Sequence, residues 1–247
     1  MHRYTQRDRI VPQRRVLLAV LETQDLATSR SDSRATVLVA ILHAALFVAS
    51  LVVVPILAPG ARIPNPFGSD DAARAFLLQS GEAIRVSSCL QLASAVCLAA
   101  LGALMTSRHQ PSRDASASGL TMVGGLGAAV LLAAAALCSW ALAAPGAVDP
   151  GSAFRTLQFL PFLMGGPGWA GFFALFLAGI VRNGTGVLPK WIVRTGWFLS
   201  IVSALAIFVM LTITVSICLP VSRFLGFLWL IWVSVQWNRS VKNALNA

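Results

Sequence analysis

The feature that most constrains this chain is a series of six long apolar runs, separated by short polar segments or segments rich in Pro and Gly. A helix needs about 20 apolar residues to cross a bilayer core of about 30 Å. The runs therefore predict an all-α fold, a polytopic transmembrane helix bundle of about six spans. We expect the spans at about 35–57, 84–105, 119–144, 156–181, 190–219 and 223–237.

The composition of the whole chain supports the same fold class. Of the 247 residues, 57% are hydrophobic and only 11% are charged. Soluble domains carry about 25% charged residues, so a soluble fold of this size could not cover so much apolar surface. All but two of the 19 basic residues are arginine. This bias, with the Ala-rich spans, predicts a bacterial source and a place in the bacterial cytoplasmic (inner) membrane.

The fourth span contains the most distinctive local motif, Gly165-Gly166-Pro167-Gly168 near its middle. Proline removes a backbone donor and clashes with the preceding turn, while glycine adds backbone freedom. We expect a kinked or broken helix here. Two interpretations stay open: a kink that lets helices pack closely, with Trp169 filling the gap, or a substrate-binding break of the kind found in some transporters.

Local signals also set the ends of two other spans. Ser69 precedes Asp70 and Asp71, and a Ser cap followed by acids in the first turn favours the start of a helix. This helix is expected to lie near the membrane surface before it enters the second span. Pro220 is expected to end the fifth span, with Ser222 capping a short sixth span from about Arg223.

The basic residues predict both the domain organisation and the orientation. Residues 1–34 form a basic cytoplasmic tail, partly disordered or interfacial, 35–237 form the six-span membrane domain, and 238–247 form a short cytoplasmic tail. With both termini inside, 14 of the 19 basic residues lie on the inner side, which satisfies the positive-inside rule. The outer five are Arg62, Arg74, Arg85, Arg155 and Arg223. We expect the inner face to bind anionic membrane lipids, and we expect no nucleic-acid partner.

Ionisable residues are expected to be scarce inside the spans. No acid falls deep in a predicted span, and His43 is the one ionisable residue expected there. The four cysteines lie in apolar runs without zinc-like spacing, and no nucleophile–base motif is present. We therefore expect no catalytic residues, no metal site and no cofactor. The lack of intramembrane carboxylates also argues against an ion-coupled transporter.

A small set of residues forms the candidate pocket. His43 is expected at a depth similar to the glycine motif; it is either a neutral packing histidine or a ligand. Gln91 and Gln158 are expected in the outer halves of their spans, where they either bond to each other or to Trp140, or line an outward-facing pocket. The full candidate pocket is His43, Gln91, Gln158, Gly165, Gly166, Pro167, Gly168 and Trp169.

Several segments carry a resemblance to a known group of proteins. They are Gly165–Gly168, Leu177–Gly179, Leu188–Trp191, Leu219–Ile231 and Ile84–Leu92. Together these segments resemble a family of uncharacterised bacterial multi-pass integral membrane proteins, described only by a domain of unknown function. The resemblance covers roughly residues 35–237 and implies six spans, without an activity or catalytic residues.

These observations favour a protein without enzymatic activity, with a structural or regulatory role exercised through lipid or protein contacts. A homo-oligomer or a membrane partner protein fits this role. The alternative hypothesis is a transporter of an uncharged solute or a lipid that uses the broken fourth span.

Overall fold

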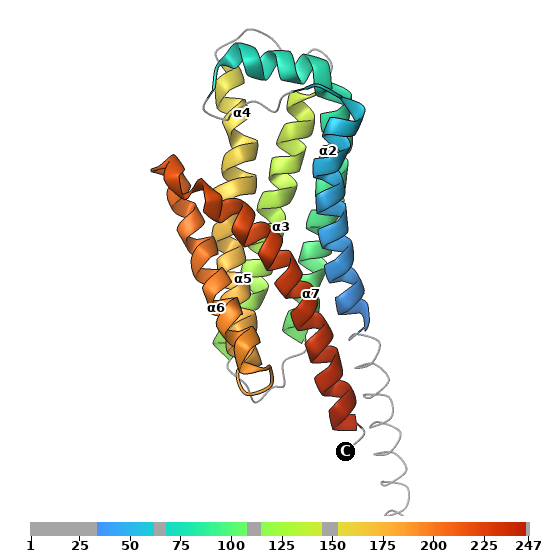
Figure 1. Cartoon of the computed structure of the whole chain (residues 1–247), viewed down its shortest axis with the longest axis vertical. Helices are drawn as coiled ribbons and strands as arrows, with labels where there is room; N and C mark the ends of the chain where they lie inside the picture. The colour runs from blue at the N-terminus through green and yellow to red at the C-terminus, as the bar shows by residue number, and fades with distance from the viewer. Residues whose placement is uncertain (1–33, 62–67, 108–114, 145–152, 246–247) are drawn as a thin grey trace, which may run out of the picture.

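The computed structural model describes residues 34–61, 68–107, 115–144 and 153–245, and the regular elements within them are all helical. Six of these helices are long and apolar enough to cross a membrane, which confirms the predicted fold class. Figure 1 shows an elongated bundle. The predicted tail of residues 1–34 lies outside the described residues except for Arg34. The six helices span Arg34–Leu57, Asp70–Ser107, Ala115–Leu142, Leu157–Gly184, Lys190–Met210 and Ile213–Arg239.

The second helix, α2 (Asp70–Ser107), has a part outside the bundle and a part within it. The first part crosses the upper end of the molecule, and the rest descends beside the first helix (Figure 1). The Ser69 hydroxyl accepts a hydrogen bond from the Ala72 amide at 3.3 Å, as the predicted cap requires. The Arg74 guanidinium lies 4.6 Å from the ring centroid of Phe154, so this crossing part of α2 contacts the start of the helix Ala153–Leu163.

Glycine permits a close backbone contact between α3 (Ala115–Leu142) and α5 (Trp169–Gly184). A Cβ atom added at Gly124 would lie 2.2 Å from the Phe176 backbone nitrogen, and one at Gly179 would lie 2.4 Å from the Thr121 backbone nitrogen. Small residues allow such backbone contact inside membranes, where van der Waals packing drives helix association. The side chain of Asn183 adds a hydrogen bond to the Thr121 hydroxyl at 3.3 Å.

The fourth span departs from α geometry at the predicted place. It consists of α4 (Ala153–Leu163), the π-helix η1 (Met164–Gly168) and α5. The chain stays helical through the Gly-Gly-Pro-Gly motif, so the expected kink or break takes the form of one widened turn. A π-turn accommodates Pro167 because the proline needs no bond to the carbonyl four residues before it.

The boundary between the fifth and sixth spans was predicted wrongly. The fifth span ends earlier than expected, with α6 (Lys190–Leu205) followed by the 3₁₀ helix η2 (Ala206–Met210). The chain turns at Leu211–Thr212, where the Thr212 hydroxyl accepts a hydrogen bond from the Thr214 amide. This turn contains neither Gly nor Pro, so the sequence lacks the two strongest turn signals there, and the Thr212 cap is a weaker one. Figure 1 shows the turn well below the upper ends of α3 and α4.

The sixth span is correspondingly longer than predicted. The 3₁₀ helix η3 (Ile213–Ile217) leads into α7 (Cys218–Leu245), a helix of 28 residues that continues into the predicted C-terminal tail. Pro220 lies in the first turn of α7, where its missing N–H has no partner to lose, so it starts the helix and does not break it. Ser222 is buried and shares a 2.5 Å hydrogen bond with Ser203 of α6, so it is not a cap.

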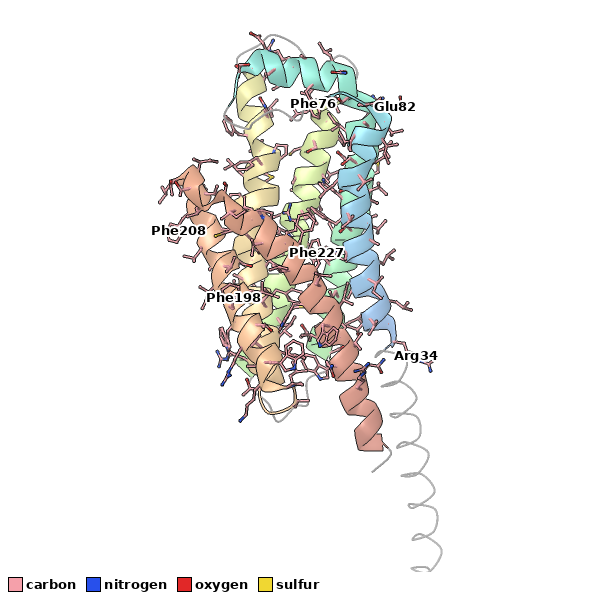
Figure 2. All side chains as sticks on the ribbon, in the orientation of Figure 1. Arg34, Phe76, Glu82, Phe198, Phe208 and Phe227 are labelled. Carbon is pink, nitrogen blue, oxygen red and sulfur yellow. The ribbon has the colours of Figure 1, made fainter. Side chains whose placement is uncertain are left out.

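Aromatic side chains fill the middle of the bundle. Trp169 and Phe173 are fully buried, and their rings stack with centroids 4.4 Å apart. Phe227 of α7 lies within the bundle, whereas Phe198 and Phe208 lie on its outer side (Figure 2). Many other large apolar side chains are exposed on the outer faces, which is the arrangement of a protein surrounded by lipid.

Candidate functional site

The π-turn leaves one backbone carbonyl without its usual partner. In an α-helix the amide of Trp169 would donate to the carbonyl of Gly165, four residues earlier. Here the Trp169 amide donates to the carbonyls of Met164 and Gly166 instead. A backbone acceptor that loses its usual donor is costly where water is excluded unless a further donor meets it.

Arg223 of α7 supplies that donor. Its Nη2 atom donates a hydrogen bond to the Gly165 carbonyl oxygen. The guanidinium also lies between two aromatic rings, with Cζ 4.4 Å from the Trp169 centroid and 4.7 Å from the Phe47 centroid. Arg223 thereby connects α7, the π-turn and the first helix. This contradicts the expectations that Arg223 lies on the outer side at the start of the sixth span and that His43 is the one ionisable residue within a span.

The positive charge of Arg223 is tolerated at this position but not neutralised. An arginine at the centre of a membrane helix costs about 2.5–3.5 kcal/mol. Two cation–π contacts of about 1–2 kcal/mol each offset a cost of that size. The carboxylates among the described residues are Asp70, Asp71 and Glu82, all in the first half of α2 and none in an ion pair with Arg223. Figure 2 shows Glu82 near the upper end of the bundle.

Arg223 also keeps a donor that the chain does not use. Its Nε atom is buried and has no hydrogen-bond partner among the described residues. The indole Nε1 of Trp169, which is fully buried, has none either. A guanidinium that presents an N–H and an uncompensated charge matches the oxygen atoms of a phosphate or a carboxylate.

Arg223, the Gly165 carbonyl and the rings of Phe47 and Trp169 form what we call the arginine site. His43 lies beside this arginine site and is bonded to α2. Its Nδ1 atom is 2.9 Å from the Ser94 carbonyl oxygen and 2.8 Å from the Ser94 hydroxyl, and that hydroxyl donates to the His43 carbonyl at 2.9 Å. A carbonyl only accepts, so this geometry places a proton on Nδ1. His43 is therefore positioned to pack the first helix against α2.

Phe227 joins His43 to the arginine site. The His43 ring meets Phe227 edge-on at 4.6 Å between centroids, and Phe227 meets Phe47 at 5.3 Å and Trp169 at 6.1 Å. The sequence placed His43 and the glycine motif at similar depth, and the structure connects them through this shared phenylalanine.

The remaining residues of the candidate pocket form no side-chain hydrogen bond to the arginine site among the described residues. Gln91 and Gln158 are half-buried, and neither amide forms a side-chain hydrogen bond to another described residue. Trp140, their expected partner, is 45% exposed. Gly168 is closely surrounded, because a Cβ atom there would lie 3.0 Å from the Leu163 carbonyl oxygen, whereas one at Gly166 would have room, with its nearest neighbour at 3.7 Å.

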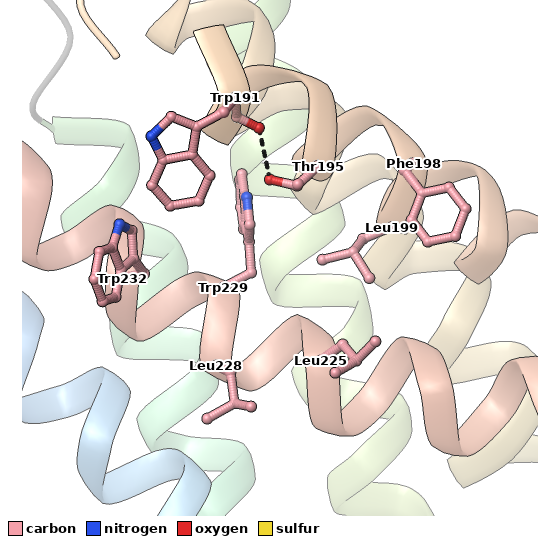
Figure 3. Close-up of a pocket in the computed structure, with 8 residues that line it drawn as sticks. All are labelled: Trp191, Thr195, Phe198, Leu199, Leu225, Leu228, Trp229 and Trp232. Carbon is pink, nitrogen blue, oxygen red and sulfur yellow. Dashed lines mark hydrogen bonds between the residues drawn. The ribbon is translucent and has the colours of Figure 1, made fainter. Parts of the chain in front are cut away.

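A second feature lies on the outer face, between α6 and α7. An apolar groove of about 420 Å³ opens there (Figure 3). Sequence reasoning missed it because Trp191 and the residues after Pro220 were assigned to the ends of separate spans. Its residues include Trp191, Thr195 and Phe198 from α6, and Leu225, Leu228 and Trp232 from α7.

The described residues contain no cluster of His, Cys, Asp or Glu that could hold a metal ion. Comparison with known proteins gave no match among protein-family models, curated proteins or solved structures. The resemblance to uncharacterised bacterial membrane proteins therefore stays a prediction, and function has to be argued from the arginine site and the groove.

Proposed function

We propose that this chain is a multi-pass protein of the bacterial cytoplasmic membrane that acts by binding an anionic amphiphile at Arg223, and that it has no catalytic activity of its own. The observation that carries the proposal is the uncompensated guanidinium inside the helix bundle. Intramembrane charges usually pair with another charge, and the described part of this chain supplies none. The head group of a lipid or fatty acid supplies both the missing charge and acceptors for the arginine N–H groups.

The orientation with both termini in the cytoplasm is part of this proposal. The sequence places five basic residues on the outer side, and Arg223 is one of them. Its place inside the bundle reduces that number to four, namely Arg62, Arg74, Arg85 and Arg155, so the excess on the inner side becomes larger.

Native mass spectrometry of the protein released from its membrane in mild detergent tests the proposal. Wild type should retain at least one anionic lipid or fatty acid that Arg223→Met loses, because methionine fills the space without charge. Arg34→Gln is the matched control, since Arg34 is exposed at the lower end of the first helix (Figure 2). Equal numbers of anionic ligands on the wild type and on Arg223→Met would refute the proposal.

A second candidate function is movement of a lipid across the bilayer, favoured by the π-turn itself. π-turns often lie at functional sites, and the glycines around Pro167 would let this one change register. The positive charge of Arg223 favours an anionic lipid over an uncharged solute in this candidate. In vesicles, Pro167→Ala with Gly168→Ala should then abolish the movement of a labelled anionic lipid but not its binding. A doubly substituted protein with unchanged movement would remove this candidate.

A further inference from the structure

The groove between α6 and α7 offers its occupant an apolar surface. The Thr195 hydroxyl, its one polar side-chain group apart from the indoles, donates to the backbone carbonyls of Trp191 and Ile192 at 2.9 and 3.1 Å. The Trp229 indole donates to the Ile192 carbonyl at 3.1 Å. Because the Thr195 hydroxyl and the Trp229 indole are bonded within the chain, the part of the groove between them is apolar and fits a hydrocarbon chain.

The two ends of the groove differ in chemistry. Trp191 of α6 and Trp232 of α7 lie together at one end, with ring centroids 5.8 Å apart, while Phe198 and Leu225 lie toward the other (Figure 3). Indole rings favour the level of lipid head groups, and aliphatic and phenyl side chains favour the hydrocarbon below it. The lining of the groove thus changes from indole rings to purely apolar side chains in the same direction as a phospholipid changes from head group to acyl chain.

Exposed cations lie on the side of the tryptophan pair. Lys190 directly precedes Trp191, Arg194 is three residues after it, and Arg239 is seven residues after Trp232 on α7. Positions three or seven apart share one helix face, so Arg194 and Arg239 continue the faces that carry the two tryptophans. All three side chains are exposed.

We propose that this groove binds an anionic phospholipid of the inner leaflet. One acyl chain lies along the groove between Phe198 and Leu228, and Lys190, Arg194 and Arg239 contact the phosphate. The assignment to the inner leaflet rests on the proposed orientation, and the site is separate from the arginine site in the bundle.

Tryptophan quenching by brominated lipid tests the site in the full-length protein. The protein is reconstituted in phosphatidylcholine vesicles that contain increasing fractions of brominated phosphatidylglycerol or brominated phosphatidylcholine. The part of the quenching that is present in the wild type and absent from the Trp191→Phe/Trp232→Phe variant comes from lipid in the groove. Wild type should reach half-maximal quenching at a mole fraction of the anionic lipid that is lower by roughly tenfold, because three cations face its phosphate.

Two variants separate the head group from the acyl chain. Lys190→Gln/Arg194→Gln/Arg239→Gln should quench equally with both brominated lipids. Leu228→Phe, which narrows the groove without adding an indole, should lower quenching by both. Equal quenching of the wild type by the two lipids would overturn the proposal, and so would an absence of groove quenching together with a dimer by light scattering, which would indicate a second copy of the chain in the groove.

The proposals for the two lipid sites can be refuted separately. Arg223→Met should keep the preference for anionic lipid in the groove, because the hydrogen bond and the ring contacts of Arg223 involve none of the groove residues. A loss of this preference in Arg223→Met, with the triple variant unaffected, would overturn the groove and leave the arginine site in place.

Discussion

The guanidinium of Arg223 lies over the indole of Trp169, with 4.4 Å between Cζ and the ring centroid. The same tryptophan follows the π-turn whose Gly165 carbonyl accepts the hydrogen bond from Arg223. One side chain of α7 is therefore bound to both the backbone and the aromatic ring of the fourth span. The charge in the bundle and the irregular helix form a single feature.

Substitutions at Trp169 should distinguish its ring face from its N–H. Trp169→Phe keeps an aromatic face for Arg223, removes an indole N–H that has no described partner and leaves a smaller cavity than leucine would, so we expect the smaller loss of stability. Trp169→Leu removes the cation–π contact and leaves a cavity, and should cost about 2–4 kcal/mol. Unfolding in mixed micelles of increasing SDS content measures both. Similar losses for the two variants would show that the ring face does not matter.

Ser94→Ala should destabilise the protein by about 0.5–1.5 kcal/mol. The substitution removes the hydroxyl that bonds to His43 within the bundle, while the bond between His43 Nδ1 and the Ser94 carbonyl remains, so the cost is that of a lost buried hydrogen bond. Ser80→Ala is the matched control, because Ser80 is equally buried on the same helix but its hydroxyl has no described partner. We expect the control to unfold like wild type in the same micelle titration. A Ser80 variant as unstable as the Ser94 variant would contradict the assigned role of His43.

Gly124→Ala should prevent the close contact of α3 with α5. The new methyl group would lie 2.2 Å from the Phe176 backbone nitrogen, and backbone atoms cannot move aside without displacing the helix. Gly119→Ala on the same helix meets no atom within 4 Å and serves as the control. We expect the Gly124 variant to aggregate or to lose several kcal/mol of stability, while the control gains slightly from helix propensity. Equal yields and equal unfolding midpoints would argue against this packing.

Reporter fusions test the proposed topology. A fluorescent protein fused after Ala247 should fluoresce, and alkaline phosphatase at the same position should be inactive, because an even number of spans with an inner N-terminus leaves the C-terminus in the cytoplasm. An active phosphatase fusion would contradict this orientation.

Much of the fold follows from apolar run length, because a bilayer requires every spanning helix to have a minimum apolar length. The Gly-Gly-Pro-Gly motif also predicted the irregular turn, since proline and glycine act on their own backbone. The position of Arg223 was predicted wrongly because it does not depend on a local effect of this kind. Its position depends on whether Pro220 ends one helix or begins the next, and proline is compatible with both.

The sequence predicted the depth of the site in the membrane better than it predicted which side chains contact each other there. His43 and Trp169 share Phe227 because three helices meet there, and no local pattern encodes that meeting. Gln91 and Gln158 were chosen as polar residues at the right depth, but depth does not determine which face of a helix they occupy. The turn at Leu211–Thr212 has no Gly or Pro to reveal it.

The central claim, that Arg223 binds an anionic amphiphile, is tested most directly by titrating dodecyl phosphate into the protein in an uncharged detergent, with binding followed by calorimetry. Inorganic phosphate and dodecanoate serve as comparisons: they distinguish a free anion from an amphiphile and a phosphate from a carboxylate. The Lys190→Gln/Arg194→Gln/Arg239→Gln background removes the contribution of the groove. In that background we predict saturable binding of an anionic amphiphile that Arg223→Met abolishes and Arg223→Lys weakens. Binding that is unchanged in Arg223→Met would contradict the claim.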